Sequence, residues 1–451
     1  MRSILLKNAD FVVQDRDKVI RDASVYVEGG VIQDVGPAMD INNQHKADME
    51  FDCRGHIVIP GLINSHNHLY EISQRGLGKD YPLDEWIKKI VYPVNQMLTG
   101  DDYYWLELMA CADAARNGTT AIVEMMTSFA RFHADRGVEA FLDFGMRGAV
   151  ARSSSNRSRI SDAENRPPEE DYKATAEFID RWRERASPLV KPWVGPSMTI
   201  TCEPSFQAEL KRLAKEKGVK YHVHLAETAG ITKAARDNGY LGDVALAYAH
   251  GLLDENTVIA HAVWVTDIEL EMVKLAGAQI VHNPSSNQVL ADGAAPVARM
   301  VAKGITVGLG TDGPSSNDSL DMVAEMKSCV KLSRVSTLNT TVLSSKQVFE
   351  MATLGGATIL GYGNLGKLYK GFLADIACFR MRRNPSLYPV YDPIDALVYY
   401  GSGRDNVLTI IGGKVVYYDG SWPTIDVDKG MEKLDDICER VRGLLRIGAD
   451  R

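Results

Sequence analysis

The middle of this chain repeats one unit, a short apolar run rich in β-branched residues followed by an amphipathic helical stretch. The repetition extends from about residue 59 to residue 365. Its strand-like runs are Thr119–Glu124, Lys220–His224, Thr257–His261, Gln279–His282 and Ile305–Gly310. Alternating strands and helices produce a parallel sheet, because each helix returns the chain to the same end of the sheet. About 300 residues of this pattern fit a (β/α)8 TIM-type barrel, and a doubly wound open sheet is the alternative.

Both ends of the chain have a different sequence pattern, which is typical of short strands joined by hairpin turns. These strand patterns are Ser3–Lys7, Phe11–Gln14, Ala23–Glu28, Val31–Val35, Ala374–Phe379, Val407–Ile411 and Lys414–Tyr418. Neither end alone has enough strands for a stable sheet. We therefore predict an α/β protein with two domains. One is a small β-sandwich domain built from residues 1–58 and 366–451, with a helix near residues 430–446, and the other is the barrel over residues 59–365.

Composition excludes several classes of partner. The formal net charge of −8 and the lack of long basic stretches argue against nucleic acid. No run of 18 apolar residues is present, so no membrane span is expected. The six cysteines are scattered without a C-x-x-C pair, and the N-terminal apolar stretch is too short for a signal peptide. We expect a cytoplasmic protein that acts on a small molecule.

Two histidines lie one residue apart at the end of an apolar strand. His66 and His68 close the stretch Ile57–Leu69, which contains a Pro-Gly pair. Residues at i and i+2 of a strand face the same side. Both imidazoles can therefore bind one metal ion, although such a pair on its own is more often structural.

Further polar residues stand at the ends of other predicted strands. His224 and His261 end two of them, 37 residues apart, and Asp312 follows a third, 51 residues later. In a barrel the carboxyl ends of all strands meet on one face, so these residues converge. Singly, the histidines could be core residues and Asp312 a turn residue. His222, on the strand of His224, is expected to face the opposite way and is not assigned as a ligand, and His282 is a weak pocket candidate.

Together the polar residues form a set suited to a divalent metal such as Zn²⁺. The predicted metal ligands are His66, His68, His224 and Asp312. A bound ion would lower the pKa of its water to ~7 and make a hydroxide nucleophile. Glu227, three residues after His224, would shuttle a proton, and His261 would polarise the reacting centre. The alternative for Glu227 is a helix-capping role.

These motifs resemble the amidohydrolase superfamily. The matching segments are Pro60–His68, His224–Thr228, Ile259–His261, His282–Asn287, Gly310–Asp318 and Gly366–Asp375. More narrowly they look like the branch of methylthioadenosine/adenosylhomocysteine deaminases, guanine and pterin deaminases, and triazine hydrolases. The resemblance implies one Zn²⁺ or Fe²⁺ per subunit, with Glu227, His261 and Asp312 as the catalytic residues. It also implies a homodimer or homotetramer.

Two positions depart from the nucleoside deaminases of this branch. In those enzymes a Trp-x₆-Pro-x-Glu segment provides an acid for the ribose hydroxyls, whereas here Trp86 and Pro93 lead to Asn95. A histidine after Gly-Pro on the fourth strand is replaced by Ser197. Both changes weigh against methylthioadenosine and adenosylhomocysteine as substrates, and Asn95 and Ser197 remain candidate substrate contacts.

Other candidate substrate contacts are similar to those of the triazine hydrolases. Glu71 follows the His-x-His motif, and Ser316 lies in the segment after Asp312. We expect Ser316 to hydrogen-bond a ring nitrogen and Trp86 to stack on the substrate or cover it. Glu71 could equally be a solvated or salt-bridged residue at the start of a helix. Arg152, among serines, is a further pocket candidate.

We therefore predict a metal-dependent hydrolytic deaminase of a small nitrogen heterocycle, of the purine, pterin or triazine type. Metal-bound hydroxide would attack a C=N carbon and expel ammonia. Displacement of chloride, an alkylamine or a carbamate or urea group is an alternative on the same fold, and methylthioadenosine/adenosylhomocysteine deamination is another. A non-catalytic binding protein is a remote alternative, because every ligand position is filled.

Overall fold

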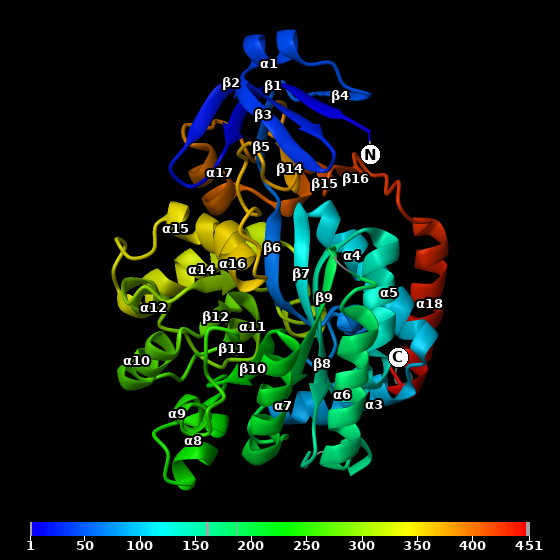
Figure 1. The fold of residues 1–451 in the computed structure, drawn as a ribbon, viewed down its shortest axis with the longest axis vertical. Helices are drawn as coiled ribbons and strands as arrows, with labels where there is room; N and C mark the ends of the chain where they lie inside the picture. The colour runs from blue at the N-terminus through cyan, green and yellow to red at the C-terminus, as the bar shows by residue number, and fades with distance from the viewer. Residues whose placement is uncertain (1, 159–161, 187, 448–451) are drawn as a thin grey trace.

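A computed structural model describes residues 2–158, 162–186 and 188–447. Its larger part is a barrel of eight parallel strands that neighbour one another in chain order (Figure 1). The strands are β6 (Leu62–Asn67), β7 (Thr119–Met126), β8 (Arg147–Ser154), β9 (Val190–Pro196), β10 (Tyr221–Leu225), β11 (Thr257–His261), β12 (Gln279–His282) and β13 (Val307–Leu309). The backbone N–H of Asp312 donates to the carbonyl of His66 at 3.1 Å and links the end of β13 to β6. The predicted TIM-type fold is therefore confirmed.

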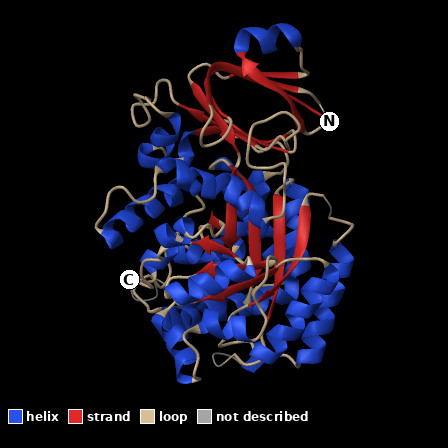
Figure 2. Ribbon diagram, turned by 60° about the vertical axis from the view of Figure 1, so that its left-hand side comes forward, coloured by secondary structure: helices blue, strands red, loops and turns tan. Residues whose placement is uncertain are grey.

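Helices cover the outside of the barrel, so its strands are buried on both faces (Figure 2). This double burial explains why the strands contain apolar runs, such as Ala121–Val123 of β7, instead of a strict alternation of apolar and polar residues. The covering helices are α4 (Gly100–Arg116), α5 (Ala134–Phe144), α6 (Pro168–Trp182), α7 (Pro204–Lys217), α8 (Ala229–Asp237), α9 (Asp243–Ala249), α10 (Asp267–Ala276), α11 (Pro284–Val289), α12 (Val297–Ala302), α14 (Met322–Thr337), α15 (Ser345–Glu350) and α16 (Gly356–Ile359). Several begin with a capping box, as at Thr99 and Thr266.

A second, mixed sheet combines strands from both ends of the chain. Its strands are β1 (Ile4–Val13), β2 (Val19–Glu28), β3 (Val31–Pro37), β4 (Met49–Asp52), β5 (His56–Pro60), β14 (Ile376–Arg380), β15 (Asn406–Ile411) and β16 (Lys414–Tyr418). The strand β5 joins the two halves, because it pairs in parallel with β1 and antiparallel with β14. This arrangement confirms the predicted β unit from both termini, which lies above the barrel in Figure 1.

The remaining short helices lie in the connections within each unit. They are α1 (Ala38–Gln44), α2 (Leu83–Trp86), α3 (Tyr92–Met97), α13 (Pro314–Asn317) and α17 (Pro393–Tyr400). The last helix, α18 (Val427–Leu444), runs along the barrel beside α4 (Figure 1). Arg440 of α18 donates from Nη1 to Asp102 Oδ2 at 3.2 Å, so the chain end is held on the barrel. Within the described ranges, no helix combines the length and apolarity that crossing a membrane requires.

The chain passes from one sheet to the other between β5 and β6. Gly61 is the only residue between these strands, and a Cβ there would lie 2.1 Å from Thr120 Oγ1. We propose that the domains divide near residues 58 and 366. The close approach at Gly61 packs the end of one unit against the start of the other.

Candidate metal centre and active site

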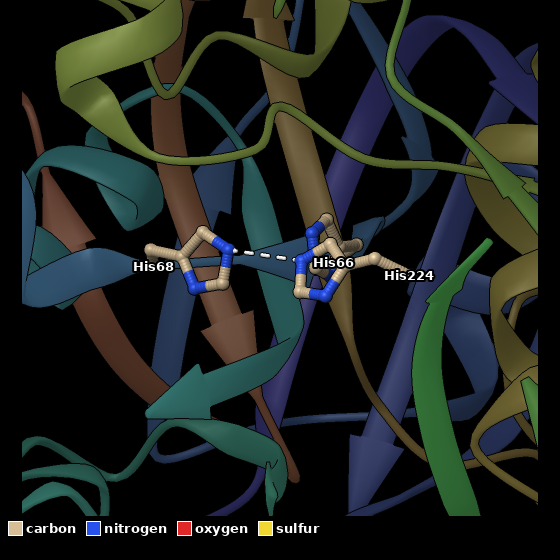
Figure 3. Close-up of side chains that lie close together, drawn as sticks. All are labelled: His66, His68 and His224. Atoms are coloured by element: carbon tan, nitrogen blue, oxygen red, sulfur yellow. Dashed lines mark hydrogen bonds between the residues drawn. The ribbon is translucent and has the colours of Figure 1, made fainter. Parts of the chain in front are cut away.

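Three imidazoles and one carboxylate from distant parts of the chain meet at the carboxyl end of the barrel. His66 is the last residue but one of β6, His68 comes directly after that strand, and His224 lies on β10 (Figure 3). The Nε2 atoms of His68 and His224 are 3.3 Å apart. Asp312, after β13, places Oδ1 at 3.4 Å from His66 Nε2 and 3.5 Å from His68 Nε2. The predicted four-residue set is thus assembled around one point, and all four side chains are buried.

Hydrogen bonds on the far side of two rings fix their tautomers. His68 Nδ1 lies 2.6 Å from the carbonyl of Met125, and His224 Nδ1 lies 2.7 Å from the carbonyl of Ser197. A carbonyl oxygen only accepts, so each Nδ1 must carry the hydrogen. The two Nε2 atoms therefore present lone pairs to the shared point, as a metal ligand requires.

His222 orients the third ring, which corrects the prediction that it faces away from His224. Residues two apart on a strand share a side, and the rings of His222 and His224 are stacked with centroids 6.5 Å apart. His222 Nδ1 lies 3.0 Å from the carbonyl of Val258, so its Nε2 accepts a hydrogen bond from Nδ1 of His66 at 2.8 Å. The i, i+2 spacing of the two histidines was the signal for this role.

The remaining nitrogen of this set fits a bound cation. His66 Nε2 is buried and has no hydrogen-bond partner. Two groups of three donor atoms each lie within 4.8 Å of one another: His66 with His68 and His224, and His66 with His261 and Asp312. Buried acceptors that face each other need a cation or a proton between them. The donor set and spacing therefore fit a divalent metal ion.

Two titratable residues stand beside this centre. Glu227 follows β10 and His261 ends β11, and His261 Nε2 lies 3.7 Å from Glu227 Oε1. Burial, together with the negative charges of Asp292 and Asp312, holds the pKa of Glu227 well above its ordinary value. Glu227 can therefore hold a proton at neutral pH and release it during a reaction.

His261 is held as a neutral ring with its proton on the pocket side. Burial lowers the pKa of His261 to about 3. The side-chain amides of Asn283 and Asn287 donate to its Nδ1 at 3.3 and 3.0 Å, which leaves the hydrogen on Nε2. The backbone of His261 has φ 75°, a left-handed conformation that costs free energy in a non-glycine residue and recurs at active sites.

Two serine hydroxyls bind the other oxygen of Asp312. Ser286 donates to Oδ2 at 2.6 Å and Ser316 at 3.2 Å. Oδ1 is thereby left to face the histidines. The sequence predicted a substrate contact for Ser316 but did not single out Ser286, Asn283 or Asn287, whose shared signal is the His282–Asn287 motif.

A pocket opens onto the metal centre, and four of the predicted substrate contacts line it. These are Glu71, Trp86, Ser197 and Ser316. Ser315 donates to Glu71 Oε2, and burial raises the pKa of Glu71 to about 7. Trp86 is 7% exposed and shares its wall with apolar residues of the segment around α2.

Two other predicted contacts lie elsewhere. Asn95 is 1% exposed, and its Oδ1 accepts from Gln74 Nε2 at 3.0 Å. Arg152 pairs with Asp171 at 2.8 Å between Nη1 and Oδ1. Neither side chain lines the pocket. Their positions in the sequence suggested substrate contacts. Spacing along a helix or strand does not show which partner a buried polar side chain has. His282 is fully buried and also outside the lining.

Comparison with known proteins identifies a matching family and similar relatives. The amidohydrolase family model matches residues 57–416. A 5'-deoxyadenosine deaminase of Methanosarcina mazei is 33% identical over 98% of this chain and 99% of its own. A 5-methylthioadenosine/S-adenosylhomocysteine deaminase of Pyrococcus furiosus is 33% identical over 97% of this chain and 100% of its own.

Solved structures share the fold. An adenosine deaminase of Xanthomonas campestris with bound zinc superposes with a TM-score of 0.89 at 25% identity and covers 98% of both chains. A zinc complex of atrazine chlorohydrolase from Arthrobacter aurescens gives 0.88 at 24% identity over 96% of this chain and 100% of that one. The resemblance inferred from the motifs, and the class of hydrolases acting on C–N bonds other than peptide bonds, are confirmed. This chain belongs to the amidohydrolase family.

Proposed function

We propose that the protein is a metal-dependent hydrolytic deaminase whose substrates are small heterocycles carrying an exocyclic amine. The observation that carries this proposal is the convergence of His66, His68, His224 and Asp312 on one point, beside Glu227 and His261 and open to one pocket. Hydrolysis at a ring carbon needs an activated water, a proton donor for the ring and a group that polarises the reacting centre. The site offers a residue for each task.

Zn²⁺ is the metal we propose, with Fe²⁺ as the alternative. Three imidazole nitrogens and one carboxylate suit either ion, and the structural relative from Xanthomonas campestris contains zinc. A bound ion of this kind acts as a Lewis acid and lowers the pKa of a water to ~7. His66, His68, His224 and Asp312 would hold it.

The proposed roles of the remaining groups follow from their protonation. In its ionised form Glu227 takes a proton from the attacking water, and its raised pKa lets it hold that proton until it delivers it to the ring nitrogen. His261 stays neutral and donates from Nε2 to the oxygen that enters the ring carbon. Asp312 accepts the second proton of the water and passes it to the exocyclic amine, which then leaves as ammonia.

The 6-aminopurine ring is the first substrate class we propose. Named relatives that align over nearly the whole chain act on 5'-deoxyadenosine or on methylthioadenosine and adenosylhomocysteine. Trp86 provides an aromatic face in the pocket wall that a flat ring can stack on. Displacement of chloride, an alkylamine or a carbamate or urea group remains the alternative for this chemistry.

Two further properties belong to this proposal. We expect a homodimer or homotetramer, as the resemblance implies. We also expect a cytoplasmic enzyme, which is supported by cysteines that are all unpaired in the described part of the chain.

The decisive experiment measures ammonia release by the zinc- or iron-loaded protein from adenine nucleosides, aminopurines, aminopterins and aminotriazines. Release from one ring class, with stoichiometric metal, is expected. If no compound in the panel released ammonia although metal was bound, deamination would be rejected. Chloride, alkylamine and carbamate leaving groups would then be tested.

A further inference from the structure

A second polar group lies in the wall of the active-site pocket. Tyr92 of α3 and Glu164, at the end of the short helical turn Asp162–Glu164, both line the pocket. The Tyr92 hydroxyl donates to Glu164 Oε2, and Ser158 Oγ lies 3.2 Å from the same hydroxyl. Glu164 is only 2% exposed. A carboxylate and a phenol are therefore fixed together at the surface of the cavity.

Arg131 holds this carboxylate from behind. Arg131 is 1% exposed and does not line the pocket. Its Nη1 lies 3.6 Å from Glu164 Oε1, and its Nη2 donates to the backbone carbonyl of Glu164. The arginine balances the charge of Glu164 without offering a cation to the cavity. Glu164 Oε2 and the Tyr92 oxygen keep lone pairs that a ligand donor can use.

The pocket lining is acidic. Its acidic members are Glu71, Asp84, Glu164, Glu227 and Asp312. Among the described lining residues no lysine or arginine occurs. An anionic arm beside Glu164 would face a carboxylate, and the lining residues that the structure describes offer no cationic side chain to pair it, so its burial would be costly. A donor-bearing arm would find acceptors instead.

The rest of the lining contains both apolar and hydroxyl-bearing side chains. Apolar side chains include Trp86, Ile87, Val91 and Leu290, whereas Thr127, Ser128 and Thr201 add hydroxyls. The apolar members suit a flat ring, and the hydroxyls with Tyr92 and Glu164 suit a polar arm. The pocket can thus bind a ring and a hydroxylated or aminated substituent together.

We propose that Glu164 and Tyr92 form a specificity subsite that accepts hydrogen bonds from hydroxyl or amino groups on the arm of the substrate. The subsite and the acidic lining select neutral or cationic heterocycles over those bearing phosphate or carboxylate. This inference rests on the proposed deaminase function and names the substrate class of the same site.

The test compares substrates that share one ring and differ in the arm. Steady-state deamination is measured with adenosine, 5'-amino-5'-deoxyadenosine, 2',3'-dideoxyadenosine and adenosine 5'-monophosphate. We expect kcat/KM for the monophosphate to fall at least roughly 100-fold below that of adenosine, because its phosphate would face the Glu164 carboxylate instead of a cation. Equal use of adenosine and its monophosphate would overturn the proposal.

Variants assign the effect to the subsite. Glu164→Gln and Tyr92→Phe are expected to raise KM for adenosine by roughly tenfold, the value of one hydrogen bond to a charged group, with kcat nearly unchanged. KM for a 9-alkyladenine, whose arm has no donor, should not move. The matched control is Glu169→Gln on the exposed face of α6, which should leave both values as they are. An equal rise in KM for adenosine and for the donor-free 9-alkyladenine would overturn the assignment.

A binding measurement separates this inference from the proposed activity. The dissociation constants of inosine and inosine 5'-monophosphate are measured by calorimetry with the same variants, and folding is checked by thermal melting. Should no ring release ammonia, the deaminase proposal fails, yet tighter binding of inosine that Glu164→Gln abolishes would still support the subsite. Binding of neither nucleoside nor nucleotide to the folded protein would reject it.

Discussion

Nδ1 of His66 lies 2.8 Å from Nε2 of His222, and this contact sets the direction of a ring at the centre of the barrel. His222 is itself fixed through its Nδ1 to the carbonyl of Val258 on the next strand. The hydrogen bonds therefore run from the β11 backbone through His222 to the outer side of His66. The inner nitrogen of His66 is left with a lone pair directed at the other donor atoms.

Replacing His222 should weaken metal binding while the ligands themselves stay in place. His222→Asn removes the acceptor for His66 and frees its ring to rotate, and such outer partners contribute roughly 10–100-fold in metal affinity. The measurement is the zinc dissociation constant by competition with a chelator. His250→Asn, at an exposed position, is the control and should bind zinc normally. Unchanged affinity in His222→Asn would show that ring orientation does not depend on this contact.

Variants of Glu227 and Asp312 should distinguish a loss of catalysis from a loss of metal binding. Glu227→Gln keeps the shape of the side chain but cannot carry the proton, so turnover should fall by roughly 10²–10⁴-fold while metal content stays stoichiometric. Asp312→Ala should lose both, because a ligand is removed. Metal analysis alongside single-turnover deamination distinguishes the two. A near-normal rate in Glu227→Gln would contradict the proton-shuttle role.

Gly310 permits the last strand to close the barrel against the first. A Cβ at this position would lie 2.5 Å from Asn283 Oδ1 and 2.8 Å from the carbonyl oxygen of His66. Gly310→Ala should therefore lower the free energy of unfolding by about 1–3 kcal/mol and reduce metal occupancy. Gly363→Ala is the matched control, because nothing lies within 4 Å of a Cβ there. Thermal melting of both variants checks this, and equal melting temperatures would argue against the close approach.

Two buried carboxyl groups under the His68 segment should make stability depend on pH. Glu124 Oε2 accepts from the backbone N–H of Leu69 at 2.8 Å. Burial raises the pKa of Glu107 to about 8 from its ordinary 4.5, and burial with the neighbouring Glu107 charge raises the pKa of Glu124 well above it. The folded protein thus holds a proton that the unfolded chain releases above pH 4.5, so the free energy of unfolding falls as pH rises toward 8.

Glu107→Gln should flatten this dependence. The variant cannot ionise at position 107, so between about pH 5 and 8 it should lose a few kcal/mol less than the parent protein. Urea midpoints at pH 5.5, 7 and 8 measure the difference, with Glu169→Gln as the control. Parallel profiles in the two variants would mean that the pair stays ionised in the fold.

The sequence determined the class of fold, and it predicted which polar residues converge, because both depend on local regularities. Alternating strand and helix patterns require a parallel sheet, and polar residues that end several of its strands converge wherever the barrel closes. For this reason spacing and the family motifs together predicted that His66, His68, His224 and Asp312 lie close together. The terminal strands were predicted to combine into one sheet, because neither set was large enough to be stable alone.

Only the tertiary structure decided which polar residues face the pocket. Asn95 and Arg152 looked like substrate contacts, yet they are paired with Gln74 and Asp171 inside the fold. Glu164 carries no signal in the sequence and enters the pocket because Arg131, 33 residues earlier, fixes its carboxylate. Side-chain pairing across loops depends on three-dimensional distance and on the cost of leaving a buried charge unpaired. Neither quantity can be read from spacing along the chain, so the sequence predicted the candidate metal ligands but not the residues that line the pocket.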